Sequence, residues 1–355
     1  MPLTEPEILQ WLLEPDEARV EALYREADRV RHEHVGDAVH LRGLIEVSNI
    51  CIRQCAYCGI RAGNTSLQRY RLSRDEILEC ARQAVMFGYG TVVMQAGEDY
   101  GIERDWMGEI IQTIKRDTPL AVTLSLGERS EEELRVWREA GADRYLLRFE
   151  TSDPALFSMI HPPVHGRMAE SRIEQLLRLR ALGYEIGSGV MVGIPGQRYC
   201  SLAHDIALFG ELDLDMIGVG PYLPHPATPL GAEALRPSAG AGEQVPNSEH
   251  LTYRVVALTR LVCPQANIPS TTALSTLNTQ EGRTLGLQRG ANVVMPNITP
   301  AQYRALYEIY PAKSCIRETS SDFHAQLIAG IRALGREIGE GPGGRNKKAA
   351  SGGRV

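Results

Sequence analysis

The chain has 355 residues, of which 43% are hydrophobic, and a formal net charge of −6. No stretch approaches the roughly 18 consecutive apolar residues that a membrane-spanning helix needs, and the acidic balance gives no reason to expect a nucleic-acid or membrane partner. Residues 1–6 lack the basic–apolar–small pattern of a signal peptide. Seven cysteines, three of them clustered, argue against a disulfide framework and favour a reducing, cytoplasmic location.

The first 35 residues predict helix. Thr4 can cap a first helix, and Leu23 and Ala27 follow at helical spacing in a second, charged stretch. We therefore expect an N-terminal helical extension over residues 1–40. It either packs against the main domain or covers it as a lid.

From residue 41 onward, apolar runs alternate with polar stretches of helical periodicity. Eight runs predict strands, at 43–48, 91–96, 120–125, 144–149, 186–192, 215–220, 266–272 and 291–295. The helical stretches lie at 73–87, 103–116, 130–140, 170–182, 200–211, 248–262 and 279–288. Alternating strands and helices predict an α/β fold with a parallel sheet, and eight units over about 250 residues predict a complete (βα)8 TIM barrel over residues 41–335. A doubly wound open sheet is the alternative, although no G-x-G-x-x-G follows the first strand.

Two segments predict irregular structure. Residues 230–247 hold several glycines and prolines with little apolar content, which is typical of a loop. Residues 338–355 are rich in Gly, Lys, Arg and Ser. That composition predicts a flexible basic tail over residues 336–355.

The first predicted strand leads into Cys51, Cys55 and Cys58, a C-x3-C-x2-C motif with Tyr57 before the last cysteine. Zinc usually takes four protein ligands, whereas iron–sulfur clusters favour cysteine thiolates. Three cysteines on a [4Fe–4S] cluster leave one iron open for a small molecule. A partial zinc site or three unrelated thiols are the alternatives, but His40 is eleven residues upstream and no nearby Cys or His completes a zinc quartet.

Polar residues also follow the other predicted strands, where the chemistry of a barrel is located. With these motifs, the chain resembles the HydE family of radical S-adenosylmethionine (SAM) enzymes, which mature [FeFe]-hydrogenase. The similarity covers about residues 15–335, and its segments are 41–61, 95–99, 122–128, 140–148, 191–197, 218–226 and 290–297. Biotin synthase and methylornithine synthase share the cysteine loop but fewer of the later segments.

The resemblance implies a [4Fe–4S] cluster on Cys51, Cys55 and Cys58, whose open iron binds the amino and carboxylate groups of SAM. Reductive cleavage of SAM then releases a 5′-deoxyadenosyl radical. That radical is expected to act on an iron–carbonyl–cyanide–cysteine precursor of the hydrogenase H-cluster. The implied partners are other maturases of the pathway and a reductant such as ferredoxin or flavodoxin.

The resemblance also implies which residues hold SAM: Tyr57, Gln95, Arg148, Glu150, Arg172 and Met191. Tyr57, Met191 and the Gly193–Gly196 turn would approach the adenine, and Arg172 suits the SAM carboxylate through a bidentate fork. Tyr57 could instead be an exposed loop aromatic, and the turn an ordinary one. Glu150 and Arg172 could form a structural salt bridge with each other.

In the family, the substrate lies in an internal cavity of anion-binding character. The residues implied to line it here are Thr123, Ser125, Thr271, Thr272 and Tyr303, with Tyr307 one helical turn further on. Their hydroxyls could bind a carboxylate or a cyanide-bearing group. Packed barrel layers with internally satisfied hydroxyls are the alternative for each residue.

Some HydE proteins carry three further cysteines near the C-terminus that hold a second cluster. Cys315 matches the first of these, but Phe323 and Gln326 occupy the other two positions. We therefore expect no second cluster of that kind and interpret Cys315 as a spare thiol.

The remaining cysteines, Cys80, Cys200 and Cys263, lie in helix-like segments and are predicted to be small buried hydrophobes. His161 and His165 follow the fourth predicted strand. Neither histidine has a partner that the sequence identifies, and their loop is slightly longer than the family pattern.

Two other functions stay open at this point. One is a radical SAM enzyme that acts on an amino acid or small thioether, as methylornithine synthase does. The other is a non-catalytic iron–sulfur scaffold. Gln95, Glu150 and Arg172 argue against the scaffold, which would need no SAM ligands, and segments 122–128 and 218–226 favour the maturase.

Overall fold

The computed structural model describes residues 3–164, 171–233, 240, 242–313 and 320–345. Its strands are β1 (Ala38–Ser48), β2 (Thr91–Ala96), β3 (Ala121–Ser125), β4 (Arg144–Leu146), β5 (Glu185–Val192), β6 (Met216–Pro221), β7 (Val293–Val294) and β8 (Glu337–Ile338). Most predicted strands are confirmed at shifted bounds. β8 was not predicted.

The helices are α1 (Glu5–Leu12), α2 (Glu17–Val35), α3 (Arg74–Met86), α4 (Arg104–Asp117), α5 (Glu131–Glu139), α6 (Pro154–Ile160), α7 (Arg172–Ala181), α8 (Tyr199–Glu211), α9 (Glu249–Val262), α10 (Thr272–Leu277), α11 (Gly282–Gln288), α12 (Ala301–Arg304) and α13 (Ser320–Ala333). Each predicted helix is confirmed near its expected position. The prediction missed α6, α10, α12 and α13, three of which have seven residues or fewer.

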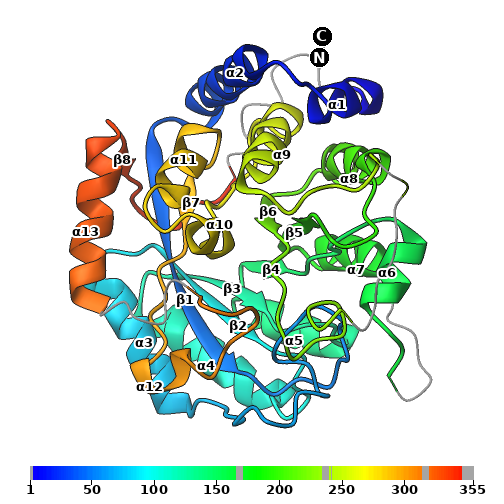
Figure 1. Ribbon diagram of the computed structural model, residues 1–355. Helices are drawn as coiled ribbons and strands as arrows, with labels where there is room; N and C mark the ends of the chain where they lie inside the picture. The colour runs from blue at the N-terminus through cyan, green and yellow to red at the C-terminus, as the bar shows by residue number, and fades with distance from the viewer. Residues whose placement is uncertain (1–2, 165–170, 234–239, 241, 314–319, 346–355) are drawn as a thin grey trace.

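The strands form a parallel sheet in the order β6-β5-β4-β3-β2-β1-β7, with β8 beside β1. From β1 to β6 the spatial order follows the chain order. A doubly wound sheet instead reverses direction at a switch point, so that alternative is wrong. Figure 1 shows the helices as an outer layer around the strands. The fold is therefore α/β and TIM-barrel-like.

The predicted strand 266–272 is not a regular strand. Asn267 makes a single parallel bridge to Met216 of β6, and Pro269 makes one to Val293 of β7. Proline has no N–H to donate to a ladder, and α10 starts at Thr272, so pairing stops after these bridges.

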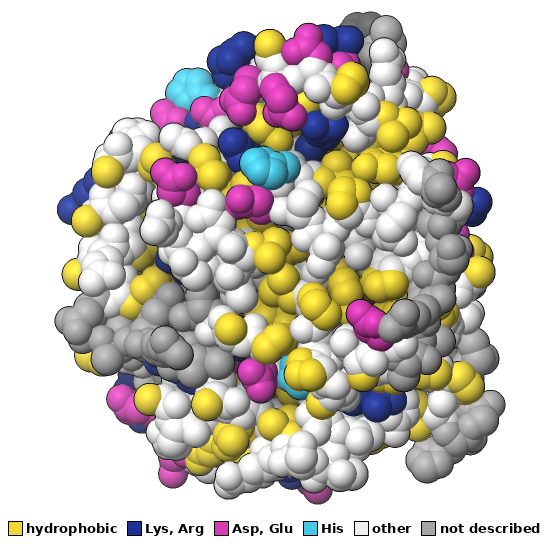
Figure 2. All heavy atoms as spheres, viewed as in Figure 1, with side chains coloured by type: hydrophobic (Ala, Val, Ile, Leu, Met, Phe, Trp, Pro, Cys, Tyr) yellow, Lys and Arg dark blue, Asp and Glu magenta, His cyan; other side chains and the backbone are white. Residues whose placement is uncertain are grey.

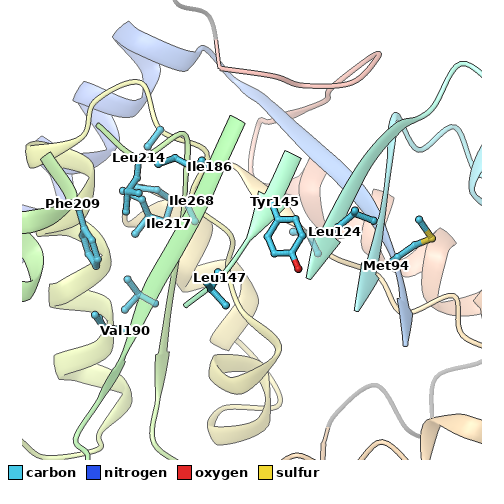
Figure 3. Packing of buried hydrophobic residues seen from close by; sticks show 14 of the residues in the cluster. Met94, Leu124, Tyr145, Leu147, Ile186, Val190, Phe209, Leu214, Ile217 and Ile268 are labelled. Carbon is cyan, nitrogen blue, oxygen red and sulfur yellow. The ribbon is translucent and has the colours of Figure 1, made fainter. Parts of the chain in front are cut away.

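The core lies between the sheet and the helices. Alternate strand residues point outward, and Figure 3 shows Met94, Leu124 and Tyr145 doing so from three neighbouring strands. Phe209 of α8 packs in the same core, with its ring 5.8 Å from that of Phe149. Each such side chain contributes about 1.5–3 kcal/mol when it leaves water, so this layer holds the sheet in place.

The predicted N-terminal helices lie against the outside of the helix layer. α1 packs against α8 and α9, and α2 packs against α9 and α11 (Figure 1). Arg254 of α9 donates to the carbonyl oxygens of Leu12 and Glu14, both at 2.9 Å. Charged side chains gather over α2 at the edge of the face shown in Figure 2, and hydrophobic ones occupy its middle.

Residues 339–345, here called the amino-end plug, correct the prediction of a flexible tail from residue 336. They follow β8 and cross the amino ends of the strands. Four side chains from strand starts donate to two plug carbonyls: Thr91 and Arg144 to Pro342 O (both 2.9 Å), and Arg42 and Asn267 to Gly343 O (3.0 and 3.1 Å). Glycine makes this approach possible, because a Cβ on Gly90 would lie 1.6 Å from the Gly341 oxygen.

Of the helices in the described ranges, none is both long and apolar enough to cross a bilayer. Residues 346–355, the end of the predicted tail, lie outside the described residues.

Candidate active site

The cysteine loop, residues 49–69, begins directly after β1 and lies at the carboxyl ends of the strands. Three backbone hydrogen bonds tie it to the segment after β2, to the end of α6 and to the segment after α12: Ile52 N to Glu98 O (3.0 Å), Ala56 N to Ile160 O (2.9 Å) and Gly59 N to Ile309 O (2.9 Å). The loop is therefore fixed to three separate parts of the chain.

Arg69 organises this loop from within. Its guanidinium donates to four loop carbonyls, those of Asn49 (2.6 Å), Ile60 (2.7 Å), Arg61 (2.7 Å) and Asn64 (3.1 Å). A guanidinium carries five N–H donors in one plane, so a single side chain can collect several carbonyls of a tight turn. The sequence analysis missed Arg69, since a single arginine in a loop carries no signal.

The three thiols of the predicted motif come close enough to interact electrostatically. Cys51 Sγ accepts a hydrogen bond from Glu98 N at 3.4 Å. Burial raises the pKa of all three thiols, that of Cys55 to about 12, so they are protonated in the absence of metal.

Among the described residues, no three His, Cys, Asp or Glu side chains are close enough to hold a single metal ion. A [4Fe–4S] cluster binds each cysteine through a different iron and therefore accepts a wider spacing. The donor set fits the cluster.

Glu150 ends the β4 segment in a left-handed backbone conformation, with φ 65°. Such a conformation costs a non-glycine residue about 1–2 kcal/mol. Its carboxylate is buried, and burial raises its pKa. Arg148 Nη2 lies 2.9 Å from Oε2 and forms an ion pair with it, although the described structure gives Oε2 no hydrogen bond. A strained, buried carboxylate whose described charge partner at Oε2 is one arginine marks a position where a ligand could bind.

Arg172 lies in the first turn of α7 and points back toward the strand ends. Its Nη1 donates to Arg148 O (2.6 Å), and its Nε lies 3.4 Å from Glu128 Oε1. In the described structure, Arg148 forms an ion pair with Glu150, and Arg172 forms one with Glu128. The predicted alternative of a Glu150–Arg172 salt bridge is therefore wrong.

Arg53, Glu98 and Glu128 form a network of charged side chains beside the cysteine loop. The sequence analysis did not predict these contacts. Arg53 of the cysteine loop donates to Glu98 (2.8 Å) and also forms an ion pair with Glu128. Glu98 Oε2 in turn accepts from Glu128 N at 3.2 Å. Glu98 and Glu128 follow β2 and β3, so their place at strand ends was the available signal.

A small apolar cluster surrounds two of the predicted SAM ligands. It consists of Ala56, Leu156, Ile160, Met191, Ile194, Tyr222 and Leu230, with Tyr57 and Met159 packed against it. In the adjoining turn, Gln197 Oε1 accepts from Gly193 N (2.7 Å) and Ile194 N (3.3 Å). The turn thus uses these donors internally and presents mainly apolar surface.

Gln95, another predicted SAM ligand, donates to the Tyr307 hydroxyl at 3.1 Å. Deeper in the same region, Lys313 forms a buried ion pair with Glu46, whose other carboxylate oxygen accepts from Asn297 Nδ2 (2.9 Å). The sequence analysis did not identify Glu46 or Lys313. They are 267 residues apart in the chain.

The residues predicted to line the substrate cavity are only partly brought together. Thr123 Oγ1 is buried and has no hydrogen-bond partner among the described atoms. Thr271 Oγ1 donates to Val219 O (3.1 Å), Ser125 ends β3, and Thr272 begins α10.

Tyr303 was predicted to line the substrate cavity, but its side chain points toward α3 instead. Its hydroxyl donates to Glu76 Oε1 on α3 (2.9 Å), and its ring stacks on Tyr70 with centroids 4.7 Å apart. The four-residue helix α12 turns Tyr303 toward α3, and buried Tyr307 meets Gln95 instead.

The other cysteines divide by position. Cys80 and Cys263 are buried, as predicted, but Cys200 is exposed on the first turn of α8, so the prediction for it was wrong. Cys315 and His165 lie outside the described residues.

Comparison with known proteins identifies relatives for this arrangement. The chain matches the family model of the Radical SAM superfamily over residues 45–209. It is similar to the [FeFe] hydrogenase maturase subunit HydE of Thermotoga maritima, with 45% identity over 327 residues that cover 92% of this chain and 89% of the relative. The 3-methylornithine synthase of Methanosarcina acetivorans is 29% identical over 294 residues, 82% of this chain and 79% of that one.

Two solved structures share the fold. A methylornithine synthase aligns with a TM-score of 0.78 and 24% identity, over 96% of this chain and 95% of its own. The FeFe-hydrogenase maturase HydG of Carboxydothermus hydrogenoformans aligns with a TM-score of 0.77 and 21% identity, over 94% of this chain and 75% of its own. At these identities the likeness concerns the fold alone.

Proposed function

Because this chain belongs to the HydE family of radical SAM enzymes, we propose that it acts in assembly of the H-cluster of [FeFe]-hydrogenase. The observation that carries the proposal is the juxtaposition of three thiols, one buried and two half-buried, with the strained, buried carboxylate of Glu150. Both lie at the carboxyl ends of the strands, where the chemistry of TIM-barrel enzymes takes place.

Cys51, Cys55 and Cys58 would hold the [4Fe–4S] cluster, and Tyr57, Gln95, Arg148, Glu150, Arg172 and Met191 would hold SAM. When bound, the reduced cluster supplies the electron that cleaves SAM and produces the 5′-deoxyadenosyl radical. The chain's own task is to bind, orient and exclude water. A reducing compartment such as the cytoplasm suits this thiol site, and all six described cysteines are free.

The roles proposed for the SAM residues follow from their surroundings. Tyr57 and Met191 belong to the apolar cluster and would offer a purine a dry surface. Glu150 has acceptor capacity for a hydroxyl or ammonium group. Arg172 lies beside Glu150 and contributes a positive charge that suits the SAM carboxylate.

We further propose that the substrate is an iron–carbonyl–cyanide–cysteine precursor made by a partner maturase. The interior hydroxyl of Thr123, which has no partner among the described atoms, supports a polar ligand near β3. The buried Glu46–Lys313 pair adds charged groups deeper in the same region. Ser125, Thr271 and Thr272 complete the proposed lining, and a ferredoxin or flavodoxin is the proposed reductant.

We also propose that the sheet closes into a complete (βα)8 barrel over residues 41–335, behind an N-terminal extension of residues 1–40. The bridges of Asn267 to β6 and Pro269 to β7 support this closure. In addition, Ile217 N donates to Asn267 O (3.0 Å) and Ser270 N to Val293 O (2.9 Å). Residues 267–269 would then be the seventh strand position, between β6 and β7.

The test is anaerobic. The protein is reconstituted with iron and sulfide, reduced and mixed with SAM, and 5′-deoxyadenosine is quantified beside a Cys55→Ala control. We expect product in the wild type only, because Cys55 is one of three thiols proposed to hold the cluster. A fully loaded wild type that cleaves no SAM, with or without the precursor from a partner maturase, would favour the non-catalytic scaffold.

A further inference from the structure

His161 caps the C-terminus of α6 and lies against the cysteine loop, with 3% of its surface exposed. Its Nδ1 lies 3.2 Å from Phe157 O, and its Nε2 lies 3.2 Å from the hydroxyl of Tyr57. A histidine without a predicted partner is thus joined to the aromatic residue of the cysteine motif.

The direction of these two hydrogen bonds follows from their chemistry. A carbonyl oxygen can only accept, so Nδ1 carries the proton and donates to Phe157 O. Burial and the nearby Arg172 guanidinium hold the pKa of His161 well below its usual range, so the ring is neutral. In that tautomer Nε2 is an acceptor, and the Tyr57 hydroxyl donates to it.

Two neighbouring bonds join the same two segments. In the backbone, Ala56 N donates to Ile160 O (2.9 Å). One residue further along each segment, the Tyr57 hydroxyl donates to His161 Nε2. The rings of Tyr57 and His161 meet edge to face, with centroids 5.6 Å apart and planes at 89°. The ring of Phe157 packs on the other side of His161, at 4.4 Å.

We propose that His161 is a positioning residue for SAM, which holds the Tyr57 ring in its binding orientation before SAM arrives. The inference rests on the proposed function, in which Tyr57 contacts the adenine. A loop tyrosine that rotates freely must be ordered when the ligand binds, whereas a ring already fixed by its hydroxyl avoids that cost. Because a net hydrogen bond corresponds to about a five- to tenfold change in an equilibrium constant, losing it should weaken SAM binding by about that factor.

The experiment compares His161→Phe, Tyr57→Phe and the double variant, each reconstituted with its cluster. The dissociation constant of SAM is measured by equilibrium dialysis of radiolabelled SAM, and iron content is measured alongside. Each single variant should bind SAM about five- to tenfold more weakly at unchanged iron content. The double variant should be no weaker than either single one, because both remove the same bond.

Two further variants separate positioning from general structure. His161→Gln retains an acceptor and should restore SAM affinity to within about twofold of the wild type. Tyr184→Phe removes another tyrosine hydrogen bond, to Leu134 O of α5 at 2.6 Å, and should leave SAM affinity unchanged. In His161→Phe, KM for SAM should rise while kcat changes little.

Unchanged SAM affinity in His161→Phe, or losses that add in the double variant, would overturn the inference while wild-type SAM cleavage stands. A cluster-loaded wild type that binds no SAM would instead overturn the proposed function, and this inference with it.

Discussion

At the amino ends of the strands, Arg42 and Arg144 donate to carbonyls of the amino-end plug, so the chain supplies its own partners there. At the carboxyl ends, Arg148 and Glu150 face each other at 2.9 Å, yet the described structure gives Glu150 Oε2 no hydrogen bond. Both ends bury charged side chains. Among the described residues, the carboxyl end adds to them a loop of three thiols beside the left-handed Glu150.

The contrast shows that buried charge alone does not identify a site. At the amino end, His40 Nδ1, Arg42 Nε and the plug's Arg345 Nε are among the described nitrogens without a hydrogen-bond partner, and burial together with Arg42 and Arg144 lowers the pKa of His40 to about 4. The His40 imidazole is therefore neutral, and the amino-end plug covers this end of the strands. At the carboxyl end, Glu150 Oε2 has Arg148 as an ion-pair partner but no described hydrogen bond, and its backbone is strained.

The largest effect is expected at the amino end, from Gly90→Ala. The new Cβ would meet the Gly341 oxygen at 1.6 Å, so the amino-end plug must shift and lose its hydrogen bonds. We expect a loss of about 4 kcal/mol in the free energy of unfolding, measured with urea. SAM affinity of the surviving folded protein should not change.

Gly330→Ala is the matched control for this substitution. Nothing lies within 4 Å of its Cβ position on α13, so helix propensity should stabilise the protein by about 0.5–1 kcal/mol. Equal effects of the two alanines would mean that the plug contributes nothing to stability.

The second effect concerns Asp205 of α8, which supports the carboxyl end of β4. Its Oδ1 accepts from Ser152 N (2.6 Å) and Ser152 Oγ (2.5 Å), and burial raises its pKa from 3.8 to about 6. The folded state therefore binds this proton more tightly than the unfolded state. Stability from this group is full below pH 4 and falls by about 3 kcal/mol as pH rises through 6.

Asp205→Asn should remove that dependence. The variant should match the wild type near pH 4 and exceed it by about 3 kcal/mol at pH 8, as measured by urea unfolding at each pH. Taking the difference between the two proteins cancels the other carboxylates. A difference that stays constant from pH 4 to pH 8 would show that Asp205 titrates normally.

The smallest effect on stability is expected at Glu150. Asparagine tolerates a left-handed backbone better than glutamate, so Glu150→Asn should stabilise the cluster-free protein by about 1 kcal/mol. The shorter, neutral side chain should weaken SAM binding by about 10- to 100-fold, because a charged hydrogen bond is lost. Thermal unfolding and equilibrium dialysis measure the two effects.

Asp213→Asn serves as the control for Glu150→Asn. Asp213 is also left-handed, with φ 46°, but it precedes β6 at the amino end. Its SAM affinity should equal that of the wild type. If Glu150→Asn kept full SAM affinity, the strain at Glu150 would have no functional meaning.

Sequence periodicity predicted most of the strands and helices, because alternating apolar runs are local signals. The cysteine loop was equally easy to identify from the sequence, since its three cysteines lie within eight residues. The amino-end plug was not, because its partners Arg42 and Arg144 stand about 300 and 200 residues earlier and composition alone suggested disorder. Helix α12 spans only four residues, too few for periodicity to distinguish Tyr303 from Tyr307.

The hydrogen-bond and ion-pair partners within the site could not be predicted from the sequence either. Arg172 was expected to bind SAM or pair with Glu150, but Glu128, 44 residues away, is its carboxylate neighbour. The bond between His161 and Tyr57 spans 104 residues. Residue types and strand ends predicted a site, whereas the pairing among its residues depends on how the strands are brought together.

The pairing of β1 with β7 and β8 has a consequence for biosynthesis. β1 and the cysteine loop leave the ribosome early, but β7 follows about 250 residues later and β8 later still. At a synthesis rate of about 5–20 residues per second, one edge of β1 stays unpaired for roughly 12–50 s. During that interval an unpaired strand edge and three reactive thiols are exposed together, so the nascent chain needs protection from aggregation and oxygen before the metal can be installed.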